Sequence, residues 1–133
     1  MPQSRPTYLR FVIAQRDPDS HVSKGIFQAA ADLRDAPANL APHEIETFDR
    51  AWAWLKMHLK VPPILSDRGT ERAISWFRAE AAKPIAHVRT LARLLDEHGH
   101  LTRQITTQRP GSVVYEDGWQ IVAYPPRDQR GRL

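Results

Sequence analysis

The chain has 133 residues, with 19 basic and 15 acidic side chains and no cysteine. This length indicates one domain with an ordinary buried core, and the lack of cysteine excludes disulfides, thiolate zinc sites and a cysteine nucleophile. A hydrophobic fraction of 41% and a charged fraction of 26% are typical of a soluble globular protein and argue against wholesale disorder. We expect a single domain over residues 1–126 and a basic, disordered tail over residues 127–133.

The surplus of positive charge lies at the two ends of the chain. Residues 11–100 carry twelve basic and twelve acidic side chains, so the formal charge of +4 arises outside them. Nucleic-acid-binding proteins concentrate Lys and Arg on one folded face, so this distribution favours solubilising ends over a nucleic-acid partner. The longest early apolar run, Phe11–Ala14, is too short for a signal sequence or a membrane span. We therefore expect a cytoplasmic protein with no membrane partner.

A strand is predicted near the start of the chain. The side chains of Tyr8–Ala14 alternate at period two, and both faces are apolar enough for a strand inside a sheet. Its partner strand could be Trp119–Tyr124 or Leu101–Thr107, and the sequence leaves both open.

Three helical segments are predicted next. Apolar residues recur at helical spacing over His21–Ala36, Pro42–Leu59 and Thr70–Glu97. The second segment gives the clearest pattern, with proline at its first position and acidic side chains in its first turn. Within the third segment Pro84 removes one backbone hydrogen bond, so we expect the helix to bend or split there.

The C-terminal part of the chain is predicted to form three strands. They are Leu101–Thr107, Val113–Glu116 and Trp119–Tyr124. The order β-α-α-α-β-β-β predicts an α+β fold. In this fold a C-terminal three-stranded antiparallel meander forms the sheet, the N-terminal strand joins it, and the helices pack on one face.

The last two strands are predicted to form a hairpin. Asp117-Gly118 between two apolar runs is typical of a type I′ turn. That turn places Glu116 opposite Trp119.

Three stretches of the chain carry a resemblance. Trp76-Phe77-Arg78, Leu94–Gly99 and Pro110–Ala123, together with the opening strand, resemble a group of small bacterial proteins of unknown function. The resemblance covers most of the chain and implies a single cytoplasmic domain of a bacterium. It implies no catalytic residue, cofactor or partner.

One flank of the second predicted helix is a candidate partner-binding surface. Trp54 lies opposite the apolar stripe of that helix, beside Arg50, Met57 and His58. Trp54 could pack beneath the 61–69 loop or the tail. Alternatively the four side chains bind a protein partner or a second copy, since Trp, Met and Arg are favoured interface anchors.

Arg103, Arg109, Tyr115 and His100 are candidate catalytic residues for a reaction on RNA. The order of strand, helices and meander resembles ribosome-dependent RNase toxins of the RelE/ParE type. Those toxins use Arg, Lys, His or Tyr on the sheet for acid–base chemistry and phosphate contacts. The neutral helices and the scarcity of Lys depart from that pattern, and the alternative is that these are ordinary solvent-facing side chains.

The histidines do not form a metal-site pattern. His98 and His100 flank a glycine, and His87 lies eleven residues before His98 on the same predicted helix. At about 1.5 Å per residue the two are roughly 16 Å apart and cannot share one ion without a partner chain or a sharp break in the helix. We predict no metal and no cofactor, and the chain contains no phosphate loop, nucleophile elbow or dinucleotide fingerprint.

Three functional hypotheses follow. The favoured one is a non-enzymatic cytoplasmic domain that binds a protein or forms a homodimer. The second is a toxin-like RNA-directed nuclease or RNA-binding protein. The third is a small-molecule-binding domain with a pocket between the helices and the meander, near Trp76, Tyr115 and Trp119.

Overall fold

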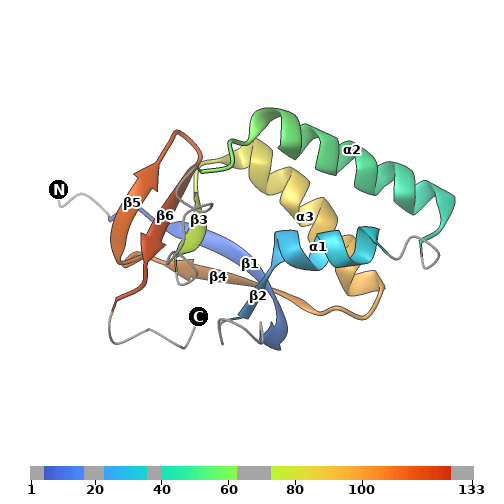
Figure 1. Cartoon of the computed structure of the whole chain (residues 1–133), viewed down its shortest axis with the longest axis horizontal. Coiled ribbons are helices and arrows are strands. Elements are labelled where there is room, and N and C mark those ends of the chain that lie inside the picture. The colour runs from blue at the N-terminus through green and yellow to red at the C-terminus, as the bar shows by residue number, and fades with distance from the viewer. Residues whose placement is uncertain (1–4, 17–22, 36–39, 63–72, 127–133) are drawn as a thin grey trace.

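The part of the chain that the structure describes folds as an α+β structure in which three helices lie against one side of an antiparallel sheet (Figure 1). The computed structural model describes residues 5–16, 23–35, 40–62 and 73–126. The helices are α1 (Ile26–Arg34), α2 (Pro42–His58) and α3 (Ala82–Glu97). The strands are β1 (Tyr8–Arg16), β2 (Ser23–Gly25), β3 (Ile74–Arg78), β4 (Thr102–Thr107), β5 (Ser112–Glu116) and β6 (Gln120–Tyr124). The α+β class is confirmed, and the predicted tail over 127–133 lies outside the described residues.

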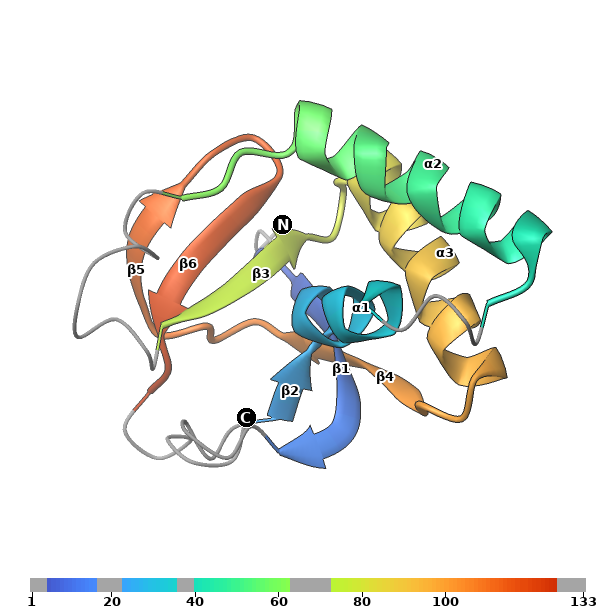
Figure 2. The ribbon, with the colours of Figure 1, turned by 45° about the vertical axis from the view of Figure 1, so that its right-hand side comes forward.

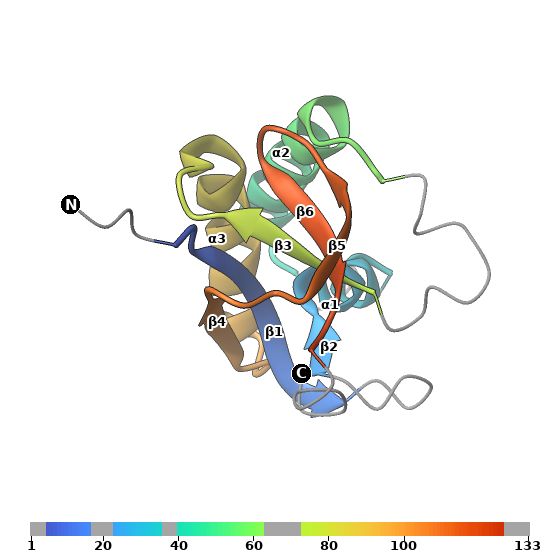
Figure 3. The ribbon, with the colours of Figure 1, turned by 90° about the vertical axis from the view of Figure 1, so that its left-hand side faces the viewer.

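The order of the strands differs from the predicted meander. Five strands follow the path β2-β1-β3-β6-β5, and β4 pairs with β1. The register of β4 covers Tyr8–Ile13 of β1, so β2 and β3 share the opposite edge of that strand. Figure 3 shows β1 running between β4 and β3. Of the two partners left open for the N-terminal strand, the structure selects Leu101–Thr107.

The prediction of a three-stranded C-terminal meander is wrong because β4 and β5 do not pair. The connection between them contains Pro110, which has no amide hydrogen to donate. It also contains Gly111, whose φ is 105°. A Cβ atom on Gly111 would lie 1.8 Å from the carbonyl oxygen of Tyr124. The connection therefore packs closely on the end of β6, and β4 pairs with β1 instead.

The third predicted helix is a strand followed by a shorter helix. Ile74–Arg78 forms β3, and α3 begins only at Ala82. Pro84 lies in the first turn of α3, where backbone amides have no partner within the helix, so no bend or split is required there. The predicted start at Thr70 lies outside the described residues.

The first predicted helix is also shorter than expected, whereas the second is confirmed. Ser23–Gly25 forms β2 and α1 begins at Ile26, because Gly25 is extended and pairs with Val12 of β1. The predicted ends at His21 and Ala36 lie outside the described residues. The helix α2 spans Pro42–His58, one residue short of its predicted end. None of the helices in the described ranges is long and apolar enough to cross a membrane.

The last hairpin forms, but with a different register and turn. Glu116 lies opposite Ile121, and Tyr115 lies opposite Val122. The amide of Asp117 donates to the carbonyl oxygen of Gln120 at 2.9 Å, so the loop is Gly118-Trp119. Gly118 does not have the positive φ that a type I′ turn requires. The predicted turn is wrong because the Asp117 side chain itself closes the loop, as described below.

The core occupies both faces of the central strands. The larger cluster lies between helices and sheet, and includes Phe48 and Leu55 of the predicted α2 stripe. A smaller cluster on the opposite face contains Ile74, Trp76, Ile121 and Ala123. Since β3 and β6 are buried on both sides, they form the rigid centre of the sheet, and the end of α2 approaches this centre (Figure 2).

Candidate ligand-binding groove

A groove of about 330 Å³ lies between the C-terminal end of α2, the helix α1 and the strands β3 and β6. This volume is at the lower end of the roughly 300–1,000 Å³ typical of small-molecule sites. Its apolar lining consists of Phe27, Trp52, Leu55, Leu59, Val61 and Pro62. Its polar lining consists of Lys56, Lys60, Ser75 and Gln120.

The aromatic wall of the groove is held in place by the core. The rings of Phe27 and Trp52 meet edge to face, with centroids 6.5 Å apart. Trp52 stacks on Phe48 at 5.5 Å, and Phe27 packs against Phe77 at 6.3 Å. Phe48 is 1% exposed, whereas Phe27 is 37% exposed. The ring of Phe27 is therefore exposed to solvent, and it packs against closely packed core rings that have little freedom to move.

The second wall forms where the chain leaves α2. The last helical hydrogen bond runs from the amide of Leu59 to the carbonyl oxygen of Leu55 at 2.8 Å. Leu59 is extended, with φ −95° and ψ 120°, so the chain turns out of the helix. Pro62 is buried and cannot continue a helix. Residues 59–62 consequently line the groove as an extended segment.

The charge of the groove is positive. Lys56 and Lys60 are exposed at its rim, and the part of its lining that the structure describes contains no Asp or Glu. An apolar groove with ammonium groups of one sign at its edge attracts ligands of opposite charge.

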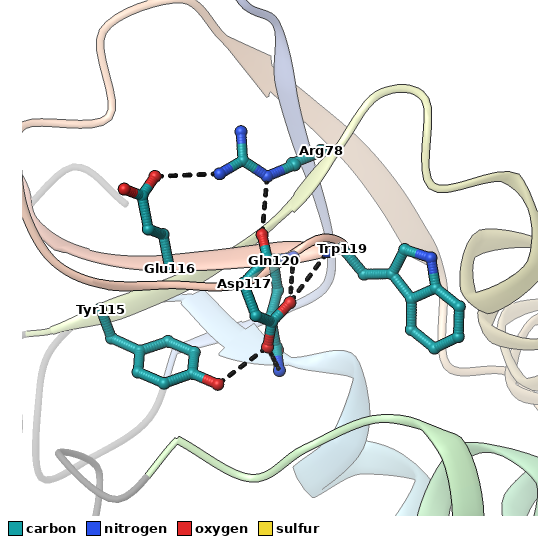
Figure 4. A network of polar contacts seen from close by, with 6 residues as sticks. All are labelled: Arg78, Tyr115, Glu116, Asp117, Trp119 and Gln120. Carbon is teal, nitrogen blue, oxygen red and sulfur yellow. Dashed lines mark hydrogen bonds and ion pairs between the residues drawn. The ribbon is translucent and has the colours of Figure 1, made fainter.

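Hydrogen bonds within the β5–β6 hairpin hold Gln120, which lines the groove (Figure 4). Asp117 Oδ1 accepts hydrogen bonds from the amides of Trp119 at 2.8 Å and Gln120 at 3.0 Å. Asp117 Oδ2 accepts from the Tyr115 hydroxyl at 2.9 Å and from Gln120 Nε2 at 3.2 Å. Gln120 Nε2 also donates to the carbonyl oxygen of Lys60. Gln120 therefore ties the hairpin to the segment that follows α2.

Arg78 supports this hairpin from β3. Its Nε donates to the carbonyl oxygen of Asp117 at 2.9 Å, and its guanidinium lies 2.9 Å from Glu116 Oε2. Both contacts are drawn in Figure 4. Arg78 holds the backbone of the hairpin, and the Asp117 carboxylate holds the amides of the loop. The hairpin is therefore held in place without any ligand.

The hydrogen bonds within this network shift two pKa values. Partial burial would raise the pKa of Asp117, but hydrogen bonds from Trp119, Tyr115 and Gln120 outweigh it and lower that pKa. The hydrogen bond between Tyr115 and Asp117 raises the pKa of Tyr115, because the neutral hydroxyl donates to the Asp117 carboxylate. In this network the Asp117 carboxylate is the acceptor and the Tyr115 hydroxyl is a donor.

The four residues predicted to bind a partner lie on one flank of α2, but Trp54 is not a bare surface residue. Its ring is stacked between His58 at 4.4 Å and His87 of α3 at 4.3 Å, and lies 5.7 Å from Trp119. These rings cover Trp54. The sequence also leaves open the alternative that Trp54 packs beneath the 61–69 loop or the tail, but residues 63–69 and 127–133 lie outside the described residues. Arg50 pairs with Glu46 within α2. The partner-binding surface stays a prediction.

The structure does not gather the candidate catalytic residues into one site. Arg103 shares the face of Ile105, which packs on the cluster opposite the helices. Tyr115 lies opposite Val122 and so projects to the helix-facing side. Arg103 and Tyr115 are therefore on opposite faces of the sheet.

His100 and Arg109 lie in separate loops. His100 follows α3, where its amide donates to the carbonyl oxygen of Leu95 at 2.9 Å, and Arg109 follows β4. The nearby His98 contacts Glu44 rather than another histidine. Within the described ranges, no three His, Cys, Asp or Glu side chains are grouped as a metal ion requires.

Sequence reasoning missed the groove, although it expected a pocket between helices and sheet. The tryptophan at its wall is Trp52, and neither Trp76 nor Trp119 lines the groove. The signal that could have located it is the pair Lys56 and Lys60 directly before the Pro62 that ends the helix pattern.

Comparisons with known proteins do not identify a relative. No family model matches the chain, and neither the curated proteins nor the solved structures contain a significant match. The resemblance to small bacterial proteins accordingly stays an expectation.

Proposed function

We propose that this protein binds a small amphipathic molecule in the groove at the end of α2, with an apolar body and an anionic head group. The observation that carries the proposal is the joining of a fixed apolar wall to a rim of two lysines. The proposal is of the same class as the third sequence hypothesis, a small-molecule-binding domain, but the groove is lined by other residues than the Trp76, Tyr115 and Trp119 expected there.

The apolar body would lie along the aromatic wall. Phe27, Trp52 and Leu59 present apolar surface that a ligand can remove from water, which contributes about 25 cal/mol per Å². The wall is supported by the core rings, and Gln120 links Lys60 to the hairpin. A groove that needs little rearrangement loses little affinity to ordering its side chains.

The head group would lie at the rim, near the ammonium groups of Lys56 and Lys60. A carboxylate there would form charge-assisted hydrogen bonds to two lysines that stay exposed to solvent, each contributing about 0.5–1 kcal/mol. A cationic head group would be repelled, and a neutral one would gain only the apolar contact. The charge of the rim therefore predicts selection by head group.

The test is a calorimetric titration with three ligands that share one chain: octanoate, octanol and octyltrimethylammonium. We expect octanoate to bind most tightly and the cation to bind least tightly. Replacing both rim lysines (Lys56→Gln with Lys60→Gln) should weaken octanoate binding about tenfold and leave octanol binding unchanged. Lys83→Gln removes an exposed lysine that does not line the groove, and is the matched control.

A second variant tests the location. Ser75 lines the floor of the groove from β3, and Ser75→Leu fills that space with an apolar side chain. The variant should lose both octanoate and octanol while its circular dichroism spectrum stays native. The proposal is wrong if the folded Ser75→Leu protein binds octanoate as the unmodified chain does, or if the three ligands bind equally.

A further inference from the structure

A second cavity, of about 400 Å³, lies on the sheet where β1 begins and β4 ends. These two points are adjacent because Tyr8 pairs with Thr107. The cavity is lined by Arg5, Thr7, Thr106, Thr107, Gln108 and Arg109. None of these residues lines the groove at α2, so the two sites are separate.

The lining supplies hydrogen-bond donors and positive charge. Arg5 and Arg109 each bring a guanidinium, and neither forms an ion pair with a carboxylate of the described residues. Thr107 Oγ1 accepts a hydrogen bond from the Arg109 amide at 3.0 Å, which leaves the hydroxyl hydrogen of Thr107 available to donate.

The backbone around the cavity is fixed on both sides. The carbonyl oxygen of Thr7 accepts from the amide of Ala79 at 3.0 Å, which holds the start of β1 against the end of β3. The ladder between β1 and β4 continues from Tyr8 to Ile13. The bond to Thr107 holds the backbone of Arg109 in turn. The backbone of Arg109 is therefore restrained, and both arginines line the same cavity.

We propose that this cavity binds the phosphate group of a small phosphomonoester. Guanidinium groups are the preferred protein partners of phosphate, because their donors match its oxygens in pairs. A monoester carries close to two negative charges at neutral pH, which balances the two guanidiniums. The cavity is larger than a phosphate ion requires, so it has room for the rest of an ester.

The charge balance distinguishes a monoester from the backbone of RNA. Each phosphodiester of RNA carries a single negative charge and cannot match both arginines with one phosphate. A monoester also has a second ionisation, with a pKa of about 6. No side chain of the cavity other than the two arginines is titratable, and a guanidinium stays charged throughout this range. Any change in affinity between about pH 7.5 and about pH 5 would therefore follow the ionisation of the ligand.

The experiment is a calorimetric titration of the full chain with phenyl phosphate, dimethyl phosphate and a short single-stranded oligouridylate. Phenyl phosphate should bind at least tenfold more tightly than dimethyl phosphate. Its affinity should fall about tenfold between about pH 7.5 and about pH 5, as the dianion becomes a monoanion. Arg5→Gln and Arg109→Gln should each weaken binding about tenfold or more.

The controls separate this site from general attraction to a basic protein. Arg93→Gln removes an exposed arginine of α3 outside the cavity and should leave phenyl phosphate binding unchanged. Arg5 and Arg109 are exposed, so their variants should keep a native circular dichroism spectrum. Equal binding of phenyl phosphate by unmodified and Arg109→Gln proteins would overturn the proposal. Tighter binding of the oligouridylate than of phenyl phosphate would overturn it in favour of an RNA-binding surface.

Discussion

The Nε2 atom of His98 lies 2.9 Å from Oε2 of Glu44, and this contact joins the end of α3 to the first turn of α2. Oε1 of the same carboxylate accepts from the amide of Ala41 at 2.9 Å. Both oxygens of Glu44 are therefore used, one to cap its own helix and one to hold the neighbouring helix.

This arrangement predicts a loss of stability in acid. The Ala41 amide, followed by His98, holds the pKa of Glu44 below its ordinary value of 4.5. A carboxylate whose pKa is lower in the folded state stabilises the protein above its unfolded pKa, and this contribution is lost as the pH falls through the folded pKa. We expect Glu44→Gln to lower the melting temperature at neutral pH and to reduce its decline between about pH 5 and about pH 3. Glu46→Gln, on the exposed face of the same helix, is the control. Identical acid profiles for both variants would contradict this account.

The contact between Asp117 and Tyr115 predicts a change in tyrosine titration. Because the ionised Asp117 raises the pKa of Tyr115, Asp117→Asn should lower that pKa toward its ordinary value of 10.0. Tyrosinate absorbance measured against pH gives the result, and Tyr115→Phe identifies the signal among the three tyrosines of the chain. If Asp117→Asn left the tyrosinate curve unchanged, the hydrogen bond would not exist in solution.

The two glycines near the β5–β6 hairpin should respond differently to a methyl group. Gly111 has φ 105°, and a Cβ there would lie 1.8 Å from the Tyr124 carbonyl oxygen. Gly118 has open space at the same position. Gly111→Ala should reduce the free energy of unfolding by about 3 kcal/mol or more, whereas Gly118→Ala should change it by about 0.5 kcal/mol or less. Urea denaturation measures both, and similar losses would mean that the close approach of Gly111 to β6 is incorrect.

The covering of Trp54 predicts a structural cost for its removal. Trp54→Ala leaves His58 and His87 without the ring between them and should reduce the free energy of unfolding by about 2–3 kcal/mol. Met57→Ala, at a side chain 79% exposed on the same helix, should change it by about 0.5 kcal/mol or less. A stable Trp54→Ala protein that loses only an interaction with another protein would instead support the surface predicted from the sequence.

Local sequence patterns correctly predicted the elements whose apolar pattern lies within one continuous segment. The apolar stripe of α2 is buried at Phe48 and Leu55, and the alternating pattern of β1 places Leu9 and Phe11 in the core. The run Ile74–Arg78 was assigned to a helix because Ile74 and Phe77 are also three residues apart, as on one helix face. Only its pairing with β1 and β6 makes this run a strand.

Long-range pairing and the groove were beyond the reach of local patterns. The β4 strand pairs with β1, which is distant in the sequence, and local patterns left both Leu101–Thr107 and Trp119–Tyr124 open as that partner. The groove joins Lys60 to Gln120, sixty residues apart, through a single side-chain amide. Neither residue is unusual alone, so the site becomes visible only after folding.

The most direct test of the proposed function follows the four tryptophan indole signals in a two-dimensional amide NMR spectrum during titration with octanoate. Trp52 lines the groove, whereas Trp54, Trp76 and Trp119 do not, and Trp52→Phe assigns the signal. We expect the Trp52 indole signal to move most, together with the backbone amides of Lys60, Ser75 and Gln120. Shifts centred on Trp54 and α3, or no saturable shift at Trp52, would contradict the proposed function.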